Sequence, residues 1–250
     1  MYRVSKILGF VLTVVFLAGG CATRSDGFFP PLKNIRLAAV TAAKDPNVWI
    51  PTLAAAAVTV GNLDNKIAED AREHQRLFSD PQGSSDDLRD LSAGFYLLTA
   101  LADRDTSVAD KGLKFGKDVV SIASAHVLTS GLKTAVGRER PGMDNHESFP
   151  SGHGTRLGGL SYLTNRNLAN LRLPNGVRMA GTLTNYGIAT AGAWARVEAG
   201  KHHPSDVLFG FAFGHFTTQF VRNAFFSPDR VAVSYEALPE GGAITIGLRF

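Results

Sequence analysis

The sequence predicts an all-α protein, a helical bundle that ends in a short C-terminal β-hairpin. Apolar residues recur at helical spacing over most of residues 34–228, and short stretches containing Pro, Gly or Asn separate these segments. There is no internal repeat and no alternation of strands with helices, which favours helices packed on one another. Over residues 229–250 the apolar spacing becomes alternating, which predicts the hairpin.

The composition is that of a globular chain. Hydrophobic residues make up 44% of the 250 residues. That is fewer than the ~120 apolar residues that six membrane-spanning helices of ~20 residues would need. The net charge is +4, and no run of five or more basic residues occurs. We therefore expect no nucleic-acid partner; a few cations around one small anion would give the same charge.

The N-terminus has the pattern of an export signal. Arg3 and Lys6 precede an apolar stretch, Ile7 to Ala18, whose 12 residues are too few to span a membrane comfortably. A basic region followed by a short apolar region is typical of a signal peptide. We expect residues 1–20 to be removed.

Cys21 is the only cysteine, and it follows three small residues. This arrangement resembles a bacterial lipobox and implies lipidation of Cys21, with residues 21–33 as a tether to the membrane. Ala22 rather than Asp follows the cysteine, so the expected location is the outer membrane, facing the periplasm. The alternative is an ordinary cleaved signal followed by a chance cysteine. A single cysteine excludes an intramolecular disulfide.

The helical segments follow in order along residues 34–228. They are expected at Leu53–Val60, Asp86–Leu101, Val108–Val136, Thr155–Leu171, Val177–Ala195, and Pro204 to about Ala224. Asp45-Pro46 and Asp80-Pro81 are interpreted as loops. The apolar segment Trp49–Val60 could line a lipid groove, but we expect it to pack in the core.

The C-terminal tail alternates apolar with small or polar residues in two short runs. Turn-forming residues 238–242 separate them. The terminal Phe250 resembles the closing strand of outer-membrane barrels, but two strands cannot form a barrel, which needs at least about eight. We expect the hairpin to pack on the bundle.

Three clusters of polar residues carry the functional signal. In the first, Lys133 precedes Arg140-Pro141 by seven positions, so on a continuous helix the two cations would share a face. In the second, Ser151-Gly152-His153 precedes a helical run. Ser151 can cap that helix, and the unpaired N–H groups at its start favour an anion.

The third cluster is Arg196 followed by His202-His203-Pro204-Ser205-Asp206. Pro204 suits the first position of a helix, which places Asp206 in the first turn. Asp206 is then expected to reach one ring nitrogen of His202 and leave the other free to attack.

Together the clusters resemble the tripartite signature of the type 2 phosphatidic acid phosphatase family. Its superfamily includes bacterial class A acid phosphatases and vanadium haloperoxidases. The matching positions span residues 133–206. The sequence departs from the signature at Ala195, where Ser is usual, and in the short interval between Pro141 and Pro150.

The resemblance implies a phosphatase acting on phosphomonoesters or lipid (pyro)phosphates through a phosphohistidine. Lys133, Arg140, Ser151, Gly152 and Arg196 would bind phosphate, His202 would be the nucleophile, and Asp206 would orient it. His153 would protonate the leaving group. No metal or cofactor is expected, because the cations supply the charge. The remaining histidines are interpreted as structural or solvated: His74, His126, His146, His203 and His215.

Two other functions stay open at this point. A vanadium haloperoxidase would use the same anion pocket with vanadate in it. A non-catalytic envelope lipoprotein could keep the fold as a scaffold, although the complete set of signature residues speaks against a decayed site.

Overall fold

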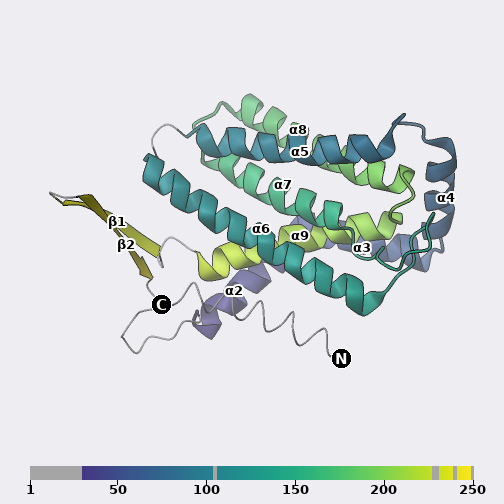
Figure 1. Cartoon of the computed structure of the whole chain (residues 1–250), viewed down its shortest axis with the longest axis horizontal. Helices are drawn as coiled ribbons and strands as arrows, with labels where there is room; N and C mark the ends of the chain where they lie inside the picture. The colour runs from purple at the N-terminus through teal and green to yellow at the C-terminus, as the bar shows by residue number, and fades with distance from the viewer. Residues whose placement is uncertain (1–29, 104–105, 227–230, 239–240, 249–250) are drawn as a thin grey trace.

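The computed structural model describes residues 30–103, 106–226, 231–238 and 241–248. Eight helices make up the bundle in this part of the chain, which confirms the all-α expectation (Figure 1). They are α2 (Leu32–Ala43), α3 (Pro46–Val60), α4 (Asp64–His74), α5 (Pro81–Leu101), α6 (Val108–Val136), α7 (Gly152–Asn170), α8 (Asn175–Glu198) and α9 (Pro204–Phe225).

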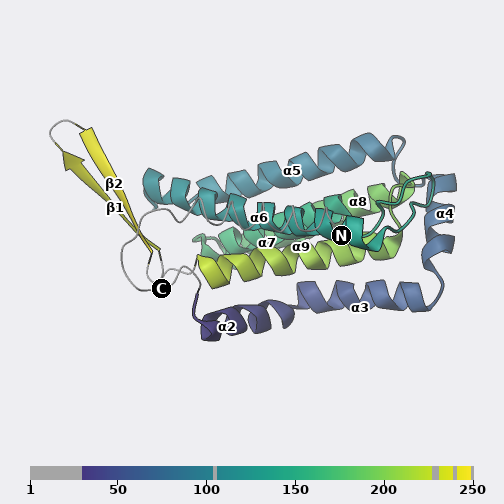
Figure 2. The ribbon, with the colours of Figure 1, turned by 60° about the horizontal axis from the view of Figure 1, so that its bottom comes forward.

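Helices α7 and α9 form the centre of the bundle. They make its most extensive helix–helix contact, while α5 and α8 pack on α7, and α2 and α3 pack on α9. In Figure 2, α5 lies on one side of the central layer and α2–α3 on the other, and α4 crosses between these sides at one end. The ends of the elements that carry the three sequence clusters therefore meet near α4.

The central helices approach closely because glycines line their contact. A Cβ atom on Gly158 would collide with the backbone carbonyl of Phe211, and one on Gly214 would collide with that of Thr155. Near the start of both helices, a Cβ on Gly210 would lie 2.6 Å from the carbonyl oxygen of Ser151. Backbone packs directly on backbone here, which only glycine permits.

Most helix bounds lie near the expected ones, and α6 has the expected bounds. The interpretation of Asp45-Pro46 and Asp80-Pro81 as loops was incomplete, because both aspartates are N-caps. Asp45 accepts a hydrogen bond from the Asn47 N–H at 2.9 Å, and Asp80 accepts one from the Gly83 N–H at 3.0 Å. Each proline is the first residue of its helix. An N–H at this position would have no acceptor within the helix, so its absence in proline costs nothing.

Helix α4, like α2, was not among the helices expected from the sequence. Most of its eleven residues are polar, and the two apolar side chains that it buries are the alanines Ala68 and Ala71. Such a helix lacks the broad apolar stripe on which periodicity depends. Ala71 packs with Val197 and Val207, and the polar contacts described below also hold the helix in place.

The bundle buries many polar side chains and exposes many apolar ones. Core packing of Trp49–Val60 was the wrong expectation for the outer side of α3. Trp49 is 46% exposed, Leu53 61% and Val60 82%, while Ala55 is buried. The outer side of α2 continues this surface with Leu32, Leu37 and Val40. Apolar patches of this kind mark contacts with a partner or a membrane.

Among the described helices, α6 alone is long and apolar enough to cross a membrane by length and composition. Only 17% of its most apolar window is buried, so it is not a core helix. A single helix of this kind is weak evidence for a span.

Two antiparallel strands, β1 (Val231–Leu238) and β2 (Gly241–Leu248), follow the bundle. Val231 pairs with Leu248, and Leu238 with Gly241. The expected packing of this hairpin on the bundle stays a prediction. The expected signal peptide and Cys21 lie outside the described residues, and α2 begins two positions before the expected boundary at residue 34.

Candidate active site

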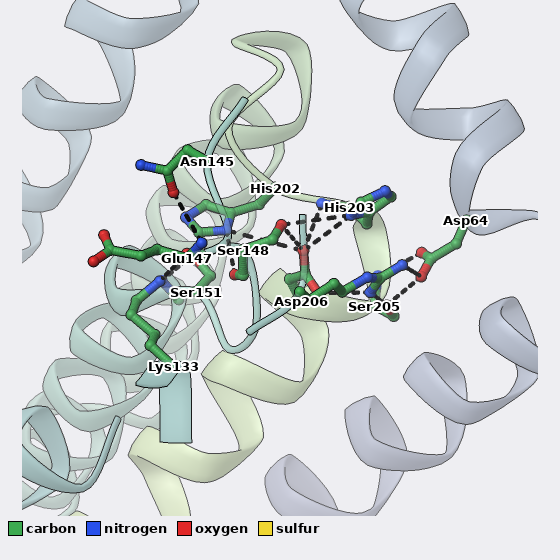
Figure 3. Close-up of polar contacts among 12 residues, drawn as sticks. Asp64, Lys133, Asn145, Glu147, Ser148, Ser151, His202, His203, Ser205 and Asp206 are labelled. Atoms are coloured by element: carbon green, nitrogen blue, oxygen red, sulfur yellow. Dashed lines mark hydrogen bonds and ion pairs between the residues drawn. The ribbon is translucent and has the colours of Figure 1, made fainter. Parts of the chain in front are cut away.

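The three clusters of the sequence meet where α6 and α8 end and α7 and α9 begin. Figure 3 labels Lys133, Ser151, His202 and Asp206 from these clusters. Helix α6 stops at Gly137, whose φ of 61° is a left-handed conformation that favours glycine. The expectation that Lys133 and Arg140 share one helix face was therefore wrong. Arg140 lies in the following loop, where its N–H donates to the Asn145 carbonyl at 2.9 Å.

The start of α7 is built as an anion site. Ser151 caps the helix, as expected, because its Oγ accepts a hydrogen bond from the Gly154 N–H at 3.2 Å. The Ser151 N–H donates to the Asp206 carbonyl at 3.0 Å, which ties the start of α7 to α9. The first N–H groups of a helix, here those of Gly152 and His153, have no partner within the helix and attract negative charge.

Three cations surround this helix start. Lys133 Nζ donates to the Glu147 carbonyl at 2.5 Å. Burial and the nearby charge of Arg140 lower the pKa of Lys133 to about 8. Arg196 is 7% exposed, and its Nη1 donates to Ser85 Oγ at 3.1 Å.

The guanidinium groups of Arg140 and Arg196 each have a donor without a hydrogen-bond partner among the described residues. Arg140 Nε and Arg196 Nε are buried, and neither has a hydrogen-bond partner among the described residues. Buried donors are almost always bonded in folded proteins, because leaving one unmade costs ~1–3 kcal/mol. Two such donors on neighbouring cations are suited to the oxygens of an oxyanion.

His202 is buried, with 2% of its surface exposed, and its orientation is fixed by a backbone carbonyl. Its Nδ1 lies 2.7 Å from the Ser148 carbonyl oxygen. A carbonyl can only accept, so the hydrogen is on Nδ1 and the lone pair is on Nε2. Burial and the charge of Lys133 hold the pKa of His202 well below 6.5, so the ring stays neutral and nucleophilic.

Asp206 does not orient His202 directly, which corrects the expected hydrogen bond. Its Oδ2 lies 4.0 Å from His202 Nδ1. Asp206 is the third residue of α9, and its carboxylate accepts the N–H of His203, the residue just before the helix, at 2.8 Å. It also accepts Ser148 Oγ at 2.5 Å and Arg138 Nη1 at 2.7 Å. The hydrogen-bonded link from Asp206 to His202 therefore runs through Ser148, while the charge of Asp206 raises the pKa of His202 directly.

The carboxylate of Asp206 is ionised. Burial raises its pKa, but hydrogen bonds from His203 and Ser148 and the charge of Arg138 outweigh this and lower the pKa to about 2.

His153 lies on the first turn of α7 and contacts α5. Its Nε2 is 2.9 Å from Asp86 Oδ1, and Arg89 Nη1 lies 3.3 Å from the same nitrogen. Burial and the charge of Arg196 lower the pKa of His153, while the hydrogen bond with Asp86 raises it and only partly compensates. His153 therefore gains a proton only below its usual pH range.

The structure brings together all of the expected site residues except Cys21, which lies outside the described residues. Sequence reasoning missed five others: Asp64, Asp86, Arg89, Arg138 and Ser148. Arg138 is two positions from Arg140, but nothing in the spacing distinguishes it from a solvated cation. Asp64 and Asp86 come from α4 and α5, far from the clusters in the sequence. No pattern in the residues around them indicates a role in the site.

The other histidines have structural surroundings where contacts are described. His203 Nδ1 lies 3.2 Å from Asp206, and buried His215 lies 3.2 Å from Asp45, the cap of α3. His74 is exposed beside Asp70. Within the described residues, no group of three or more His, Cys, Asp or Glu is placed to hold a metal ion.

Comparison with known proteins gives a family match and a similar fold. Residues 117–228, which contain the three clusters, match the PAP2 superfamily. The fold is similar to the crystal structure of a transmembrane PAP2 type phosphatidylglycerolphosphate phosphatase from Bacillus subtilis, with a TM-score of 0.53 and 20% identity. The match covers 74% of this chain and 94% of that one. No curated protein matches the sequence significantly.

Proposed function

We propose that the protein is a phosphatase of the PAP2 superfamily, whose family model matches residues 117–228. It hydrolyses phosphomonoesters or lipid (pyro)phosphates through a phosphohistidine, and its own cations supply the positive charge. The observation that carries this proposal is the pairing of a buried neutral His202 with two unsatisfied buried guanidinium donors, those of Arg140 and Arg196.

Binding of the phosphoryl group uses the helix start and the three cations. Lys133, Arg140 and Arg196 bind its oxygens, with the N–H of Gly152 and the hydroxyl of Ser151 as further donors. Charge spreads over these oxygens during phosphoryl transfer, and fixed donors stabilise it without reorganisation.

In the first step, His202 Nε2 attacks phosphorus, so a P–N bond forms as the P–O bond to the leaving group breaks. The leaving oxygen takes a proton from His153. In the second step, water gives a proton to His153 and attacks phosphorus, which breaks the P–N bond and releases phosphate. General acid–base catalysis of this kind contributes ~10²–10⁴ in rate.

We propose that the protein works at a membrane surface. The outer side of α2 and α3 exposes Leu32, Leu37, Trp49, Leu53 and Val60. Lys33, Arg36 and Lys44 lie on α2 or at its end, and the one acidic residue of this segment, Asp45, pairs with His215. Apolar side chains with basic neighbours favour an anionic lipid surface. A lipid on Cys21 would hold the protein there, in the cell envelope.

The direct test is release of phosphate from p-nitrophenyl phosphate, with and without a chelator. We expect full activity in chelator and loss of activity in His202→Ala. A matched control is His126→Ala, because His126 is exposed on α6. Retained activity in His202→Ala would refute the proposed nucleophile, and loss of activity in chelator would refute the metal-free reaction.

A substrate panel then separates the classes that share this chemistry. Phosphatidic acid and undecaprenyl pyrophosphate represent lipid substrates, and nucleotides represent soluble ones. Preference for the lipids in vesicles would support the membrane-surface proposal. Halide oxidation that depends on added vanadate and peroxide would instead identify a haloperoxidase.

A further inference from the structure

Two buried carboxylates near His202, those of Asp64 and Asp206, both accept hydrogen bonds from Arg138. Arg138 Nη2 donates to Asp64 Oδ2 at 2.8 Å, and its Nη1 donates to Asp206 Oδ1 at 2.7 Å. Asp64 is the first residue of α4, whereas Asp206 is in the first turn of α9. Arg138 therefore joins two helices that are far apart in the sequence. Figure 3 labels the two carboxylates, Asp64 and Asp206, that it joins.

Ser205 closes this arrangement. Its N–H donates to Asp64 Oδ1 at 2.9 Å, and its Oγ donates to Asp64 Oδ2. Arg138 Nη1 also donates to Ser205 Oγ at 2.8 Å. Asp64 thus receives hydrogen bonds from the start of α9 and from Arg138 at the same time. The side chains of Asp64 and Asp206 are 7% and 0% exposed, so water cannot replace these contacts easily.

The arrangement reaches His202 by two routes that converge on Ser148. In the first, the Ser148 N–H donates to the backbone carbonyl of Arg138 at 2.9 Å. In the second, Arg138 holds the carboxylate of Asp206, which accepts Ser148 Oγ at 2.5 Å. The Ser148 carbonyl then accepts His202 Nδ1 at 2.7 Å. The direction of this carbonyl decides which nitrogen of His202 carries the hydrogen.

We propose that Asp64 and Arg138 are positioning residues that hold the Ser148 carbonyl against His202 Nδ1, and so keep Nε2 available for attack. This inference rests on the proposed function. Neither residue bonds to the cations of the phosphate site, so their effect is on the chemical step and not on phosphate binding. Helix α4, which has no signature residue, thereby becomes part of the catalytic architecture.

The first experiment compares Asp64→Asn and Arg138→Lys with Asp70→Asn. Asn keeps the shape of Asp64 without its charge, and Lys keeps the charge of Arg138 without the fork that spans two carboxylates. Asp70 is an exposed residue of α4 that pairs with Arg76, so its variant controls for charge on the same helix. We expect kcat to fall ~10–100-fold in the first two variants, as for misplacement of a reacting group. The inhibition constant for inorganic phosphate should stay close to that of the wild type.

The second experiment reads the position of the hydrogen on His202 and does not depend on activity. Nitrogen-15 NMR of histidine-labelled protein, with the His202 signals assigned by their loss in His202→Ala, distinguishes the two tautomers. We expect the Nδ1–H form in the wild type and in Asp70→Asn, and a mixture of tautomers in Arg138→Lys.

Three outcomes would overturn the inference: unchanged kcat in both variants, loss of phosphate inhibition in proportion to kcat, or a single Nδ1–H tautomer in Arg138→Lys. An inactive wild-type protein would refute the proposed function alone, because the tautomer still tests the positioning. If Asp64→Asn does not fold, Arg138→Lys carries both measurements.

Discussion

Arg196 and Arg222 are equally buried arginines in the last turns of two neighbouring helices, yet their surroundings differ. Arg222, near the end of α9, donates from Nε to Asp118 at 2.8 Å and from Nη1 to the Phe226 carbonyl at 2.8 Å. Asp118 also accepts the hydroxyl of Tyr96 at 3.0 Å. Arg196, near the end of α8, has a single neutral partner in Ser85, and its Nε has none among the described residues.

The difference separates a structural charge from a functional one. A buried ion pair whose donors and acceptors are all bonded belongs to the architecture of the bundle, and its loss exposes the partner's charge to an apolar surrounding. A buried cation with an unmade hydrogen bond is poised for a ligand that supplies the missing acceptor. Burial alone would have placed both arginines in one class.

The largest effect is expected on stability, from Arg222→Met. Removing this arginine leaves Asp118 buried and uncompensated, which costs ~3–5 kcal/mol. Urea unfolding followed by circular dichroism measures the loss, and activity per folded molecule should be retained. If activity falls while the unfolding free energy is unchanged, Arg222 is not the structural member of the comparison.

The reciprocal effect is expected in Arg196→Gln. Loss of one donor to the transferring phosphoryl group lowers kcat/KM ~10²–10³-fold, as for removal of an oxyanion-hole donor. The free energy of unfolding should not fall, because the substitution removes a buried cation that is not fully bonded. Steady-state kinetics with an aryl phosphate and urea unfolding measure both quantities, and a variant that is destabilised but active would contradict the assignment.

Inorganic phosphate should sharpen the comparison by filling the unmade bonds. A ligand at 100 times its Kd stabilises the folded state by ~2.7 kcal/mol. We expect a rise in the thermal midpoint with phosphate for the wild type and for Arg222→Met, and none for Arg196→Gln. An equal rise in all three proteins would mean that phosphate acts elsewhere.

The smallest expected effect is a shift in the pH profile of Asp86→Asn. The hydrogen bond with Asp86 raises the pKa of His153, so its removal lowers that pKa further. His153 is then protonated only at lower pH, and the basic limb of kcat/KM should move to lower pH. The control is Asp90→Asn, because Asp90 is on the same helix and pairs with Arg89 but not with His153. A basic limb that stays in place, or that moves equally in the control, would contradict the role of Asp86.

The sequence was sufficient for the elements whose pattern is local. Helical periodicity predicted α6, and the Ser151-Gly152-His153 run predicted a capped helix start, because both depend on neighbours within a few positions. The direct Asp206–His202 bond was wrong for a physical reason: the carboxylate caps its own helix and leaves His202 to the Ser148 carbonyl. That competition depends on the loop after Gly137, which sequence spacing does not describe.

Contacts made over long sequence separation could not be predicted in this way. Asp64 meets Ser205 and Asp86 meets His153 because α4 and α5 pack against the ends of the central helices. Neither aspartate has a pattern in its own neighbourhood that distinguishes it from a helix-start acid. The residues that orient the two histidines were therefore visible only in three dimensions.

The glycine contact between α7 and α9 limits how this site can change. Because Gly210 lies against the backbone of Ser151, and Gly158 and Gly214 lie against backbone carbonyls, a single added methyl group would separate the two helices. The distance between the N–H donors at the start of α7 and the His202 segment before α9 is thus set by backbone contact, which side-chain repacking cannot adjust. Changes in substrate preference are then expected in residues that border the site but bind neither the phosphoryl group nor His202.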